Sequence, residues 1–339
     1  MGDVRGELPA GAVEWVAEAV GGPVIGGRRL TGGTHAVTHL LTTGGVPERV
    51  VLRCFPAGDP APGREGAVLA ALDGLGGLAP RLVAEDPAGE RLGVPAVLTT
   101  VVPGRADITV ARPVALGAAL ARLHAVPVGP AVPVRRCPGA PAPEGVAVAG
   151  SGGPVADGAA TAGSGAAFPD GTAVPVGPAF RDGMVVAGPG SGPAHRPVER
   201  ERLAGQARVL SHFDYWCGNV LWEGDRVSGI VDWSGACVAP RGFDVGWCRL
   251  DLVLLFGVGA AGEFLAGYEA AAGVRVADVP AWDRFALANA YADVENWTDN
   301  YRELGRPDLT PEVLRARHTA WSADRQATVW NERLEKPSM

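Results

Sequence analysis

The first hundred residues alternate between apolar and polar side chains in short segments, as β-strands with one buried face do. The segments with this alternation are residues 29–41, interrupted by the glycines at 32 and 33, then 49–53, 81–85 and 95–102. Residues 10–20 and 64–72 instead carry apolar side chains at helical spacing. The pattern predicts a region of short strands with two helices that ends near residue 102.

Helical periodicity dominates the remainder of the chain. Helices are expected over residues 113–125, 243–256, 263–272, 281–304 and from 310 to about 330. The second of these, which Asp244 opens, is apolar nearly all round and should be buried. The last begins with a Thr cap and a Pro at its first position, a common helix start.

One β-hairpin signal stands among these helices. Residues 219–222 and 227–232 are rich in strand formers and flank a polar turn at residues 223–226. A four-residue turn would pair Trp222 with Val227, Leu221 with Ser228 and Asn219 with Ile230. Val220, Trp222, Val227 and Val231 would then share an apolar face, because strand side chains alternate.

The opposite face of this hairpin would carry Asn219 and Asp232 as diagonal neighbours, roughly 7–8 Å apart. An amide oxygen and a carboxylate in one space can share a hard divalent cation, and Mg²⁺ prefers such oxygen ligands. Leu221, between them, offers an apolar floor for a flat ring. Asp214, on an irregular loop, could meet a substrate proton. The alternative is an ordinary hairpin with a polar rim.

Composition narrows the class of protein. The 339 residues carry a net charge of −7, which argues against a partner nucleic acid bound through its phosphates. Five cysteines with no C-x-x-C pair favour reduced thiols and give no zinc signal. Neither a signal peptide nor a membrane-length apolar run is seen. A soluble cytoplasmic protein that binds no membrane is therefore expected.

The stretch from residue 127 to 200 differs from everything around it. Its 74 residues include 28 Gly and Pro, and no Leu, Ile, Trp, Tyr or Lys. So little apolar surface favours a disordered segment. Two origins are open: a natural flexible insertion, or compensating frameshifts in a GC-rich gene that replaced a helical segment.

The motifs around the hairpin resemble a known family. His212-x-Asp214, followed five residues later by Asn219 and then by a strand that ends in Asp232, follows the logic of the protein-kinase catalytic loop and metal-binding Asp. Trp233, where kinases have Phe and Gly, is a departure. The Val-Asp-Trp form at 231–233, with Gly-Phe-Asp-Val at 242–245, resembles the aminoglycoside phosphotransferase family.

This resemblance implies an α+β, protein-kinase-like two-lobed fold. Residues 1–102 would form an N-terminal nucleotide-binding lobe with a small antiparallel sheet. Residues 103–339 would form a mainly helical lobe for catalysis and acceptor binding. The cofactors implied are Mg²⁺ and ATP (or GTP) as co-substrate. The family generally builds helices where this chain has residues 127–200, so the two origins above bear on whether the protein is active.

The resemblance also implies roles for individual residues. Asp214 would be the catalytic base, and Asn219 and Asp232 would hold the metal. Arg53, where kinases have Lys, would position phosphates and pair with Glu65; a plain surface ion pair is the alternative. The remaining nucleotide contacts would come from three places: the turn at the glycines 32 and 33, the strand that leads into the hinge between the two lobes, and the hairpin. The residues are Gly32, Gly33, Thr34, Thr99, Thr100, Val101 and Leu221. Supporting roles fall to His212 and to Asp244, which would brace the catalytic loop and could also cap its helix.

The acceptor is less well specified. Asp293, Trp297 and Tyr301 recur every four residues, and a carboxylate beside an indole could bind a cationic acceptor. A solvated helix face is the alternative. The implied reaction moves the γ-phosphoryl group to a hydroxyl of a small molecule, such as an aminoglycoside or a related antibiotic or metabolite. A vestigial nucleotide-binding pseudo-enzyme and a choline or amino-alcohol kinase remain as alternatives. The protein is expected to be a monomer or homodimer.

Overall fold

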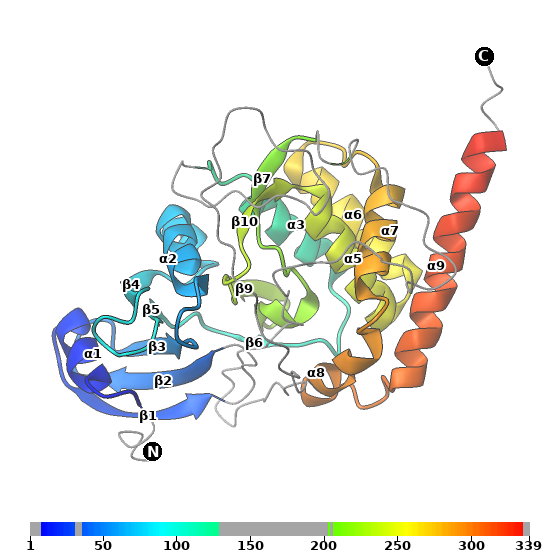
Figure 1. Ribbon diagram of the computed structural model, residues 1–339. Helices are drawn as coiled ribbons and strands as arrows, with labels where there is room; N and C mark the ends of the chain where they lie inside the picture. Colours follow the sequence, from blue (N-terminus) through cyan, green and yellow to red (C-terminus); the bar gives the residue numbers. More distant parts are fainter. Residues whose placement is uncertain (1–7, 31–35, 129–202, 204–205, 335–339) are drawn as a thin grey trace.

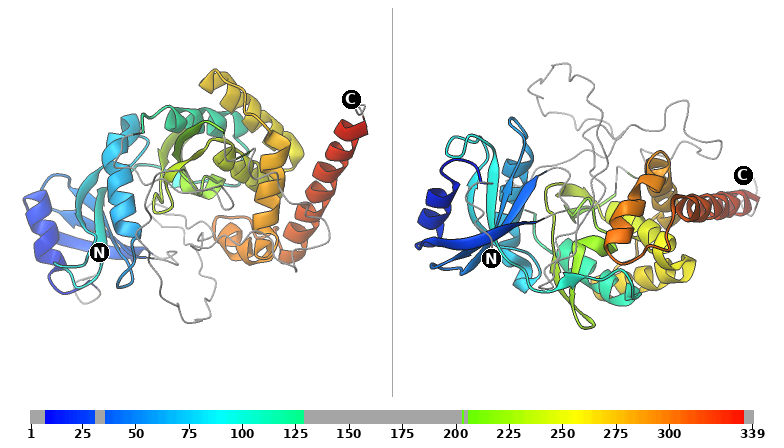
Figure 2. Two further views of the ribbon diagram at one scale, coloured as in Figure 1. Left: turned by 45° about the horizontal axis from the view of Figure 1, so that its top comes forward. Right: turned by 90° about the horizontal axis from the view of Figure 1, so that it is seen from below.

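The computed structural model describes residues 8–30, 36–128, 203 and 206–334, and these form two lobes that lie side by side in every view (Figures 1 and 2). The N-terminal lobe is built on a five-stranded antiparallel sheet with the order β1-β2-β3-β5-β4. Its strands are β1 (Val24–Leu30), β2 (Val37–Thr43), β3 (Arg49–Cys54), β4 (Leu82–Asp86) and β5 (Ala96–Thr100).

One helix lies on each face of this sheet. α1 (Ala12–Val20) ends at Gly21, whose φ of 70° is the left-handed conformation that closes many helices. It packs Trp15 and Val16 on the face that carries Leu52 of β3. Side chains alternate along a strand, so Arg53 points to the other face, toward α2 (Ala61–Leu72). This alternation delivers a cation to the side of the sheet where α2 places Glu65.

The C-terminal lobe is mainly helical. Its helices are α3 (Pro113–His124), α5 (Gly242–Phe256), α6 (Val258–Ala272), α7 (Val279–Ala290), α8 (Thr298–Glu303) and α9 (Pro311–Leu334). α5 is buried in 14 of its 15 residues because α6, α7 and α9 pack around it. No helix in the described part of the chain is long and apolar enough to cross a membrane.

Short strands and short 3₁₀-helices complete the two lobes. β7 (Arg208–Ser211) pairs with β10 (Cys237–Pro240), and β6 (Arg105–Ala106), β8 (Val220–Glu223) and β9 (Arg226–Ile230) form a second small sheet. The 3₁₀ turns are η1 (Asp73–Gly77), η2 (Cys217–Asn219) and η3 (Val294–Trp297). A short segment that contains Pro103 connects β5 to β6. The hydroxyl of Ser228 on β9 donates to the carbonyl of Pro103 at 2.8 Å. The connection between the lobes is thereby fixed to the hairpin.

The predicted α+β, two-lobed kinase-like fold is confirmed, but the predicted hairpin register is partly wrong. Trp222 does pair with Val227, whereas Leu221 pairs with Gly229 and Val220 with Ile230. A bulge between Leu221 and Trp222 produces this shift, because it inserts one extra residue into one strand. Asn219 therefore lies in η2 before the strand, and not opposite Ile230.

The boundaries of the hairpin turn and of one helix also differ from the prediction. The polar turn is shorter than predicted, since Glu223 and Arg226 already pair and leave two residues between them. The helix expected over residues 281–304 is broken into α7, η3 and α8. Arg315 of α9 holds the break, because its guanidinium donates to the Tyr291 carbonyl at 2.6 Å and pairs with Glu295. The segment 127–200 lies, beyond residue 128, outside the described residues, as does Cys137; the four other cysteines are buried and form no disulfide within the described residues.

Two glycines allow α3 and α6 to pack at short range. A Cβ at Gly117 would lie 2.4 Å from the Phe264 carbonyl oxygen, and a Cβ at Gly267 would lie 2.7 Å from the Val114 oxygen. Both distances are to backbone atoms, which cannot move aside without shifting a helix. This close approach places α3 and α6 for the hydrogen bond that His124 makes with Tyr268.

We predict that Gly117→Ala lowers the free energy of unfolding by about 1–3 kcal/mol, because the added methyl group overpacks the α3–α6 contact. Gly262→Ala on α6 is the matched control, since nothing lies within 4 Å of its Cβ position. Relief of glycine's entropic cost should make that variant more stable by about 0.5–1 kcal/mol. Urea unfolding measures both; equal stability of the two variants would contradict the packing argument.

Candidate active site

The loop that carries His212, Phe213 and Asp214 is held in place by Asp244 of α5. The two carboxylate oxygens of Asp244 accept the backbone N–H groups of His212 and Phe213, each at 2.9 Å. The Phe213 backbone has a φ of 69°, a conformation that costs energy for a side chain of this size, and its ring stacks on Phe243 at 4.0 Å. Asp244 does not cap α5, whose N-terminus has no side-chain cap. Its carboxylate binds the loop.

Asp244 is itself part of a buried chain of hydrogen bonds. Nε2 of His124 lies 3.0 Å from its Oδ2, and Nδ1 of His124 lies 2.7 Å from the Tyr268 hydroxyl. Arg241 donates to the same hydroxyl at 3.1 Å. The loop is thus tied to α3 and α6 as well as to α5. His124 lies in the helix that the sequence predicts over residues 113–125.

His212 joins the loop to the residues that follow β9. Its Nε2 donates to the Val231 carbonyl at 3.0 Å, because a carbonyl can only accept. Burial lowers the pKa of His212, so the ring stays neutral at physiological pH. His212 therefore holds the loop at a fixed position relative to the segment that carries Asp232.

Asp214 is buried and bound through both of its carboxylate oxygens. Trp247 Nε1 lies 3.3 Å from Oδ1, and the amide nitrogen of Asn219 donates to Oδ2 at 3.1 Å and to the Asp214 backbone carbonyl at 2.9 Å. Burial raises the pKa of Asp214, and the negative charge of Asp232 adds to the effect. A carboxylate with a raised pKa is a better proton acceptor than one in water.

The oxygen of the Asn219 side chain has no hydrogen-bond partner among the described residues, although it is buried. The amide nitrogen is fully used by Asp214, so the orientation of the group is fixed and the oxygen faces away from that loop. A buried acceptor without a partner is costly unless a ligand or ion completes it. Asn219 therefore presents one hard oxygen atom that a cation could bind.

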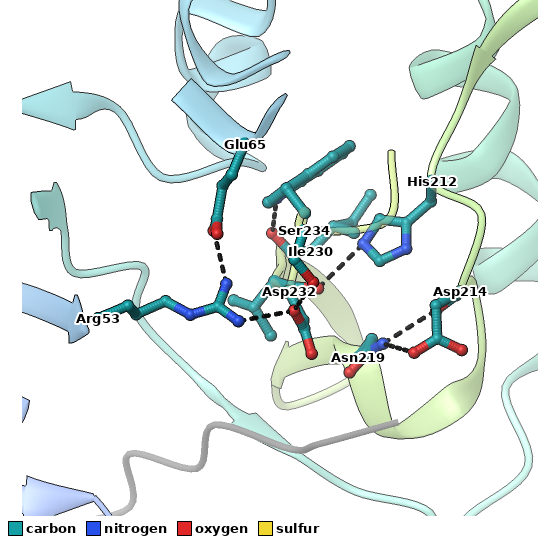
Figure 3. Close-up of polar contacts among 10 residues, drawn as sticks. Arg53, Glu65, His212, Asp214, Asn219, Ile230, Asp232 and Ser234 are labelled. Carbon is teal, nitrogen blue, oxygen red and sulfur yellow. Dashed lines mark hydrogen bonds and ion pairs between the residues drawn. The ribbon is translucent and has the colours of Figure 1, made fainter. Parts of the chain in front are cut away.

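Asp232 supplies a second oxygen atom that a cation could bind, and its carboxylate already pairs with Arg53 (Figure 3). Its backbone φ of 65° turns the chain sharply after β9. Oδ1 accepts the Ser234 hydroxyl at 2.9 Å and Nη2 of Arg53 at 2.9 Å. Burial acts to raise the pKa of Asp232, but the guanidinium of Arg53 and these hydrogen bonds outweigh it and lower the pKa. Asp232 is therefore ionised.

Arg53 bridges the two lobes. Its Nη1 donates to Glu65 Oε1 of α2 at 2.5 Å while Nη2 reaches Asp232 (Figure 3). The side chains of Arg53 and Glu65 are only 12% and 3% exposed, so the pair is not the plain surface ion pair of the alternative interpretation. Sequence reasoning placed Arg53 beside Glu65 but missed its contact with Asp232, which spans 179 residues of sequence.

The other predicted nucleotide contacts come from three parts of the chain: the glycines near residue 32, the end of β5 and the hairpin. Gly32, Gly33 and Thr34 lie outside the described residues. Thr99 is buried in β5, and Thr100 exchanges two hydrogen bonds with the Arg81 backbone, each 2.9 Å long. The Thr100 hydroxyl and N–H are therefore both hydrogen-bonded to the neighbouring Arg81 backbone. Val101 follows the end of β5 and lies at the start of the connection between the lobes.

Leu221 lies on β8, buried beside that connection. A Cβ at Gly229, its partner on β9, would lie 2.2 Å from Val102 Cγ1 and 3.4 Å from Leu221 Cδ1. The glycine thus lets the hinge residue Val102 approach the hairpin next to Leu221. This apolar surface lies where the sequence placed a floor for a flat ring.

A small pocket opens beside Trp247, which contacts Asp214, and Trp297 is in its wall. The lining residues are Trp216, Trp247, Asp251, Trp297, Asn300 and Tyr301. Asp293 is not among them; it is exposed at the start of η3 and lies 3.4 Å from the Asn296 amide. Sequence reasoning missed Asp251. Its signal was available, since Asp251 follows Trp247 by one turn on the same face of a mainly apolar helix.

Two solved structures are similar to this chain, and the first of them supports the fold. A candidate aminoglycoside phosphotransferase from Ralstonia eutropha JMP134 is 15% identical, with a TM-score of 0.51 over 91% of this chain and 97% of that one. The macrolide 2′-phosphotransferase of Brachybacterium faecium is also 15% identical, with a TM-score of 0.47 over 93% and 97%. Comparison with curated proteins gives no match.

The family comparison covers most of the chain. The model of the phosphotransferase enzyme family matches residues 26–288, a span that runs from β1 through the hairpin and α5 into α7. Arg53, Asp214, Asn219 and Asp232 all lie inside this span. The chain therefore belongs to the phosphotransferase enzyme family.

Proposed function

We propose that the protein transfers the γ-phosphoryl group of ATP (or GTP) to a hydroxyl group of a small molecule, such as an aminoglycoside or a related antibiotic or metabolite. The observation that carries this proposal is the meeting of three groups: the buried Asp214, the free oxygen of Asn219, and the Arg53–Asp232 pair. Membership of the phosphotransferase family supports the reaction class.

The oxygen atoms of Asn219 and Asp232 suit Mg²⁺. Both are hard ligands, the Asn219 oxygen is buried without a partner among the described residues, and Asp232 is ionised. When bound there with the nucleotide, Mg²⁺ would neutralise charge that develops on the phosphates. These two residues are therefore assigned as the metal ligands.

The chain's own residues perform the remaining work by position and charge. The Arg53 guanidinium offers a planar pair of donors to the phosphates, and Glu65 fixes its orientation. Asp214 accepts the proton of the acceptor hydroxyl, held in place by Trp247 and Asn219. Val101 and Leu221 border the hinge, where we place the adenine ring.

This division assigns nucleotide binding to the lobe formed by residues 1–102 and acceptor binding to residues 103–339. The base and both metal ligands belong to the second lobe, while Arg53 and Glu65 belong to the first. Catalysis would thus depend on groups from both lobes that meet at the Arg53–Asp232 contact.

A nucleotide-binding pseudo-enzyme is the second candidate. The composition of residues 127–200 favours it, because 28 of these 74 residues are Gly or Pro in a region where an acceptor wall would be expected. Such a protein would bind Mg·ATP and release no ADP with any acceptor. Turnover with a panel of aminoglycosides, macrolides and amino alcohols decides between the two candidates.

We predict that Asp214→Asn lowers kcat by about 10²–10⁴-fold, because the base is lost, while Mg·ATP affinity changes less than about threefold. ADP release measures kcat, and calorimetry measures the affinity. Asp299→Asn is the control, because this exposed carboxylate pairs only with Arg302 among the described residues and lies on the surface of α8. Equal losses of turnover and nucleotide affinity would show that Asp214 is not the base.

Arg53 donates to Asp232, which we assign as a metal ligand. The guanidinium of Arg53 and the metal ion would therefore compete for this carboxylate. We predict that Arg53→Gln binds free Mn²⁺ about tenfold more tightly than the wild type, because a buried carboxylate is left without its cation. The same variant should bind Mg·ATP about tenfold more weakly, since a phosphate contact is lost.

Arg112→Gln is the control for this experiment. Arg112 pairs with Asp107 and Asp225 beside the hairpin turn, so its removal also breaks ion pairs but leaves Asp232 untouched. Mn²⁺ binding can be followed by electron paramagnetic resonance without nucleotide. Unchanged Mn²⁺ affinity in Arg53→Gln would contradict the assignment of Asp232 as a ligand.

A further inference from the structure

Three side chains on one face of α5 contact the loop that contains the proposed base, Asp214. They stand at positions 244, 247 and 251, a spacing of three and four residues that places them on the same side of the helix. Asp244 accepts two backbone N–H groups near the start of the loop, and Trp247 Nε1 lies 3.3 Å from the Asp214 carboxylate. Asp251 accepts the backbone N–H of Cys217 at 3.0 Å. α5 therefore holds the second half of the loop as well as the first.

The N–H group that Asp251 binds belongs to the turn that ends at Asn219. Cys217 is the first residue of η2 and Asn219 is the last. The Asn219 N–H donates to the Trp216 carbonyl at 3.1 Å, and the Asn219 carbonyl accepts the Val231 N–H at 3.0 Å. Because Cys217 precedes Asn219 by only two residues, a shift of the Cys217 backbone would also move the Asn219 side chain.

Tyr301 of α8 supports Asp251 and this turn together. Its hydroxyl donates to Oδ1 of Asp251 at 2.8 Å, and its ring meets the Trp216 ring edge-to-face at 5.9 Å between centroids. A Cβ at Gly218 would lie 2.2 Å from the Trp216 ring, so that ring lies directly against the turn. Asp251 is only 4% exposed, and each of its oxygens has a donor. The carboxylate therefore has a fixed position from which it can hold η2.

A magnesium site is sensitive to small displacements of its ligands. Mg²⁺ requires near-ideal octahedral geometry, with oxygen atoms at about 2.0–2.1 Å. The Asn219 oxygen has no partner among the described residues, so its position is set by the backbone of η2 and by the bonds of its amide nitrogen to Asp214 (Figure 3). Loss of the support under η2 would move this oxygen relative to Asp232.

We propose that Asp251 is a positioning residue of the metal site, which holds η2 through the Cys217 N–H and so fixes the Asn219 oxygen that binds Mg²⁺. Asp251 acts through the backbone of the turn and not by contact with the metal. The inference rests on the proposed function, because it takes Asn219 as a metal ligand. Replacement of a residue that supports a metal ligand typically costs about 10–100-fold in metal affinity.

The first test measures the binding of Mn²⁺ alone by electron paramagnetic resonance, so it needs no turnover. Asp251→Leu removes the acceptor of the Cys217 N–H, and we expect it to bind Mn²⁺ at least about tenfold more weakly than the wild type. Asp251→Asn keeps an oxygen that can accept this N–H and should stay within about threefold of the wild type. Unchanged Mn²⁺ affinity in Asp251→Leu, or equal losses in the two variants, would overturn the proposal.

Asp86→Leu is the matched control for a general loss of stability. Asp86 is 5% exposed and accepts three backbone N–H groups in the turn between β4 and β5, each at 2.9 Å, so it is an anchor of the same kind in the other lobe. Urea unfolding should show that both leucine variants are less stable, because each leaves buried N–H groups without an acceptor. Mn²⁺ affinity should fall only in Asp251→Leu. An equal fall in Asp86→Leu would show that metal binding follows stability alone, and the proposal would fail.

A second variant removes the same hydrogen bond from the side of the loop. Trp216 has a φ of −141° and a ψ of 169°, an extended conformation that suits a residue before proline, and proline is accepted at the first position of a helix. Cys217→Pro therefore removes the N–H, whereas the control Cys217→Ala keeps it. We expect about a tenfold loss of Mn²⁺ affinity in the proline variant and less than about a threefold change in the alanine variant. Equal affinities of the two would contradict the proposal, even if Asp251→Leu does not fold.

The double variant separates loss of this one bond from independent damage. If both replacements act through the same bond, Cys217→Pro combined with Asp251→Leu should bind Mn²⁺ about as weakly as Asp251→Leu alone. Independent effects would multiply to about a hundredfold loss, which would refute the proposed route through the Cys217 N–H.

Asp232→Asn tests the metal site on which the inference rests. If Asp232→Asn weakens Mn²⁺ binding and the Asp251 and Cys217 variants do not, this inference fails alone. If Asp232→Asn leaves Mn²⁺ affinity unchanged, the metal site of the proposed function fails, and this inference fails with it.

Discussion

The contact between Arg53 and Asp232 is the interaction on which the site depends. It joins the sheet of the first lobe to the hairpin of the second, and Glu65 fixes it from α2. Three buried charges are costly to remove from water, and only close, well-oriented pairing offsets that cost. Removal of one member would leave the others uncompensated, at about 3–5 kcal/mol. The relative position of the lobes is therefore tied to groups that a nucleotide and its metal would also bind.

The second lobe holds its chemistry rigid in a different way, by a buried hydrogen-bond network. Asp244 fixes the loop, His124 and Tyr268 fix Asp244, and Asp214 is held from both sides by Trp247 and Asn219. Such a network is stable only when nearly every member has a partner. One exception in the described part of this network is the oxygen of Asn219, which has no partner and is the atom that we propose as a metal ligand.

Local sequence features predicted the elements well and their contacts poorly. Periodicity located the helix that became α5 and the strands of the first lobe, since one turn or one pleat sets the spacing. The bulge before Trp222 and the break held by Arg315 both depend on contacts with distant residues, so no local pattern shows them. The same holds for Arg53 and Asp232. Asp293 stood at the right spacing from Trp297, but folding placed Asp251, from another helix, at the pocket.

The most direct test of the account is a thermal melt of the full chain with and without Mg·ATP. Ligand at a hundred times its dissociation constant should stabilise the fold by about 2.7 kcal/mol. Asp232→Asn should remove most of that shift, because it removes both a metal ligand and the partner of Arg53. A shift in the wild type that is lost in the variant is the predicted result. A wild type without any shift, or a variant that keeps the full shift, would contradict a nucleotide site built on Asp232.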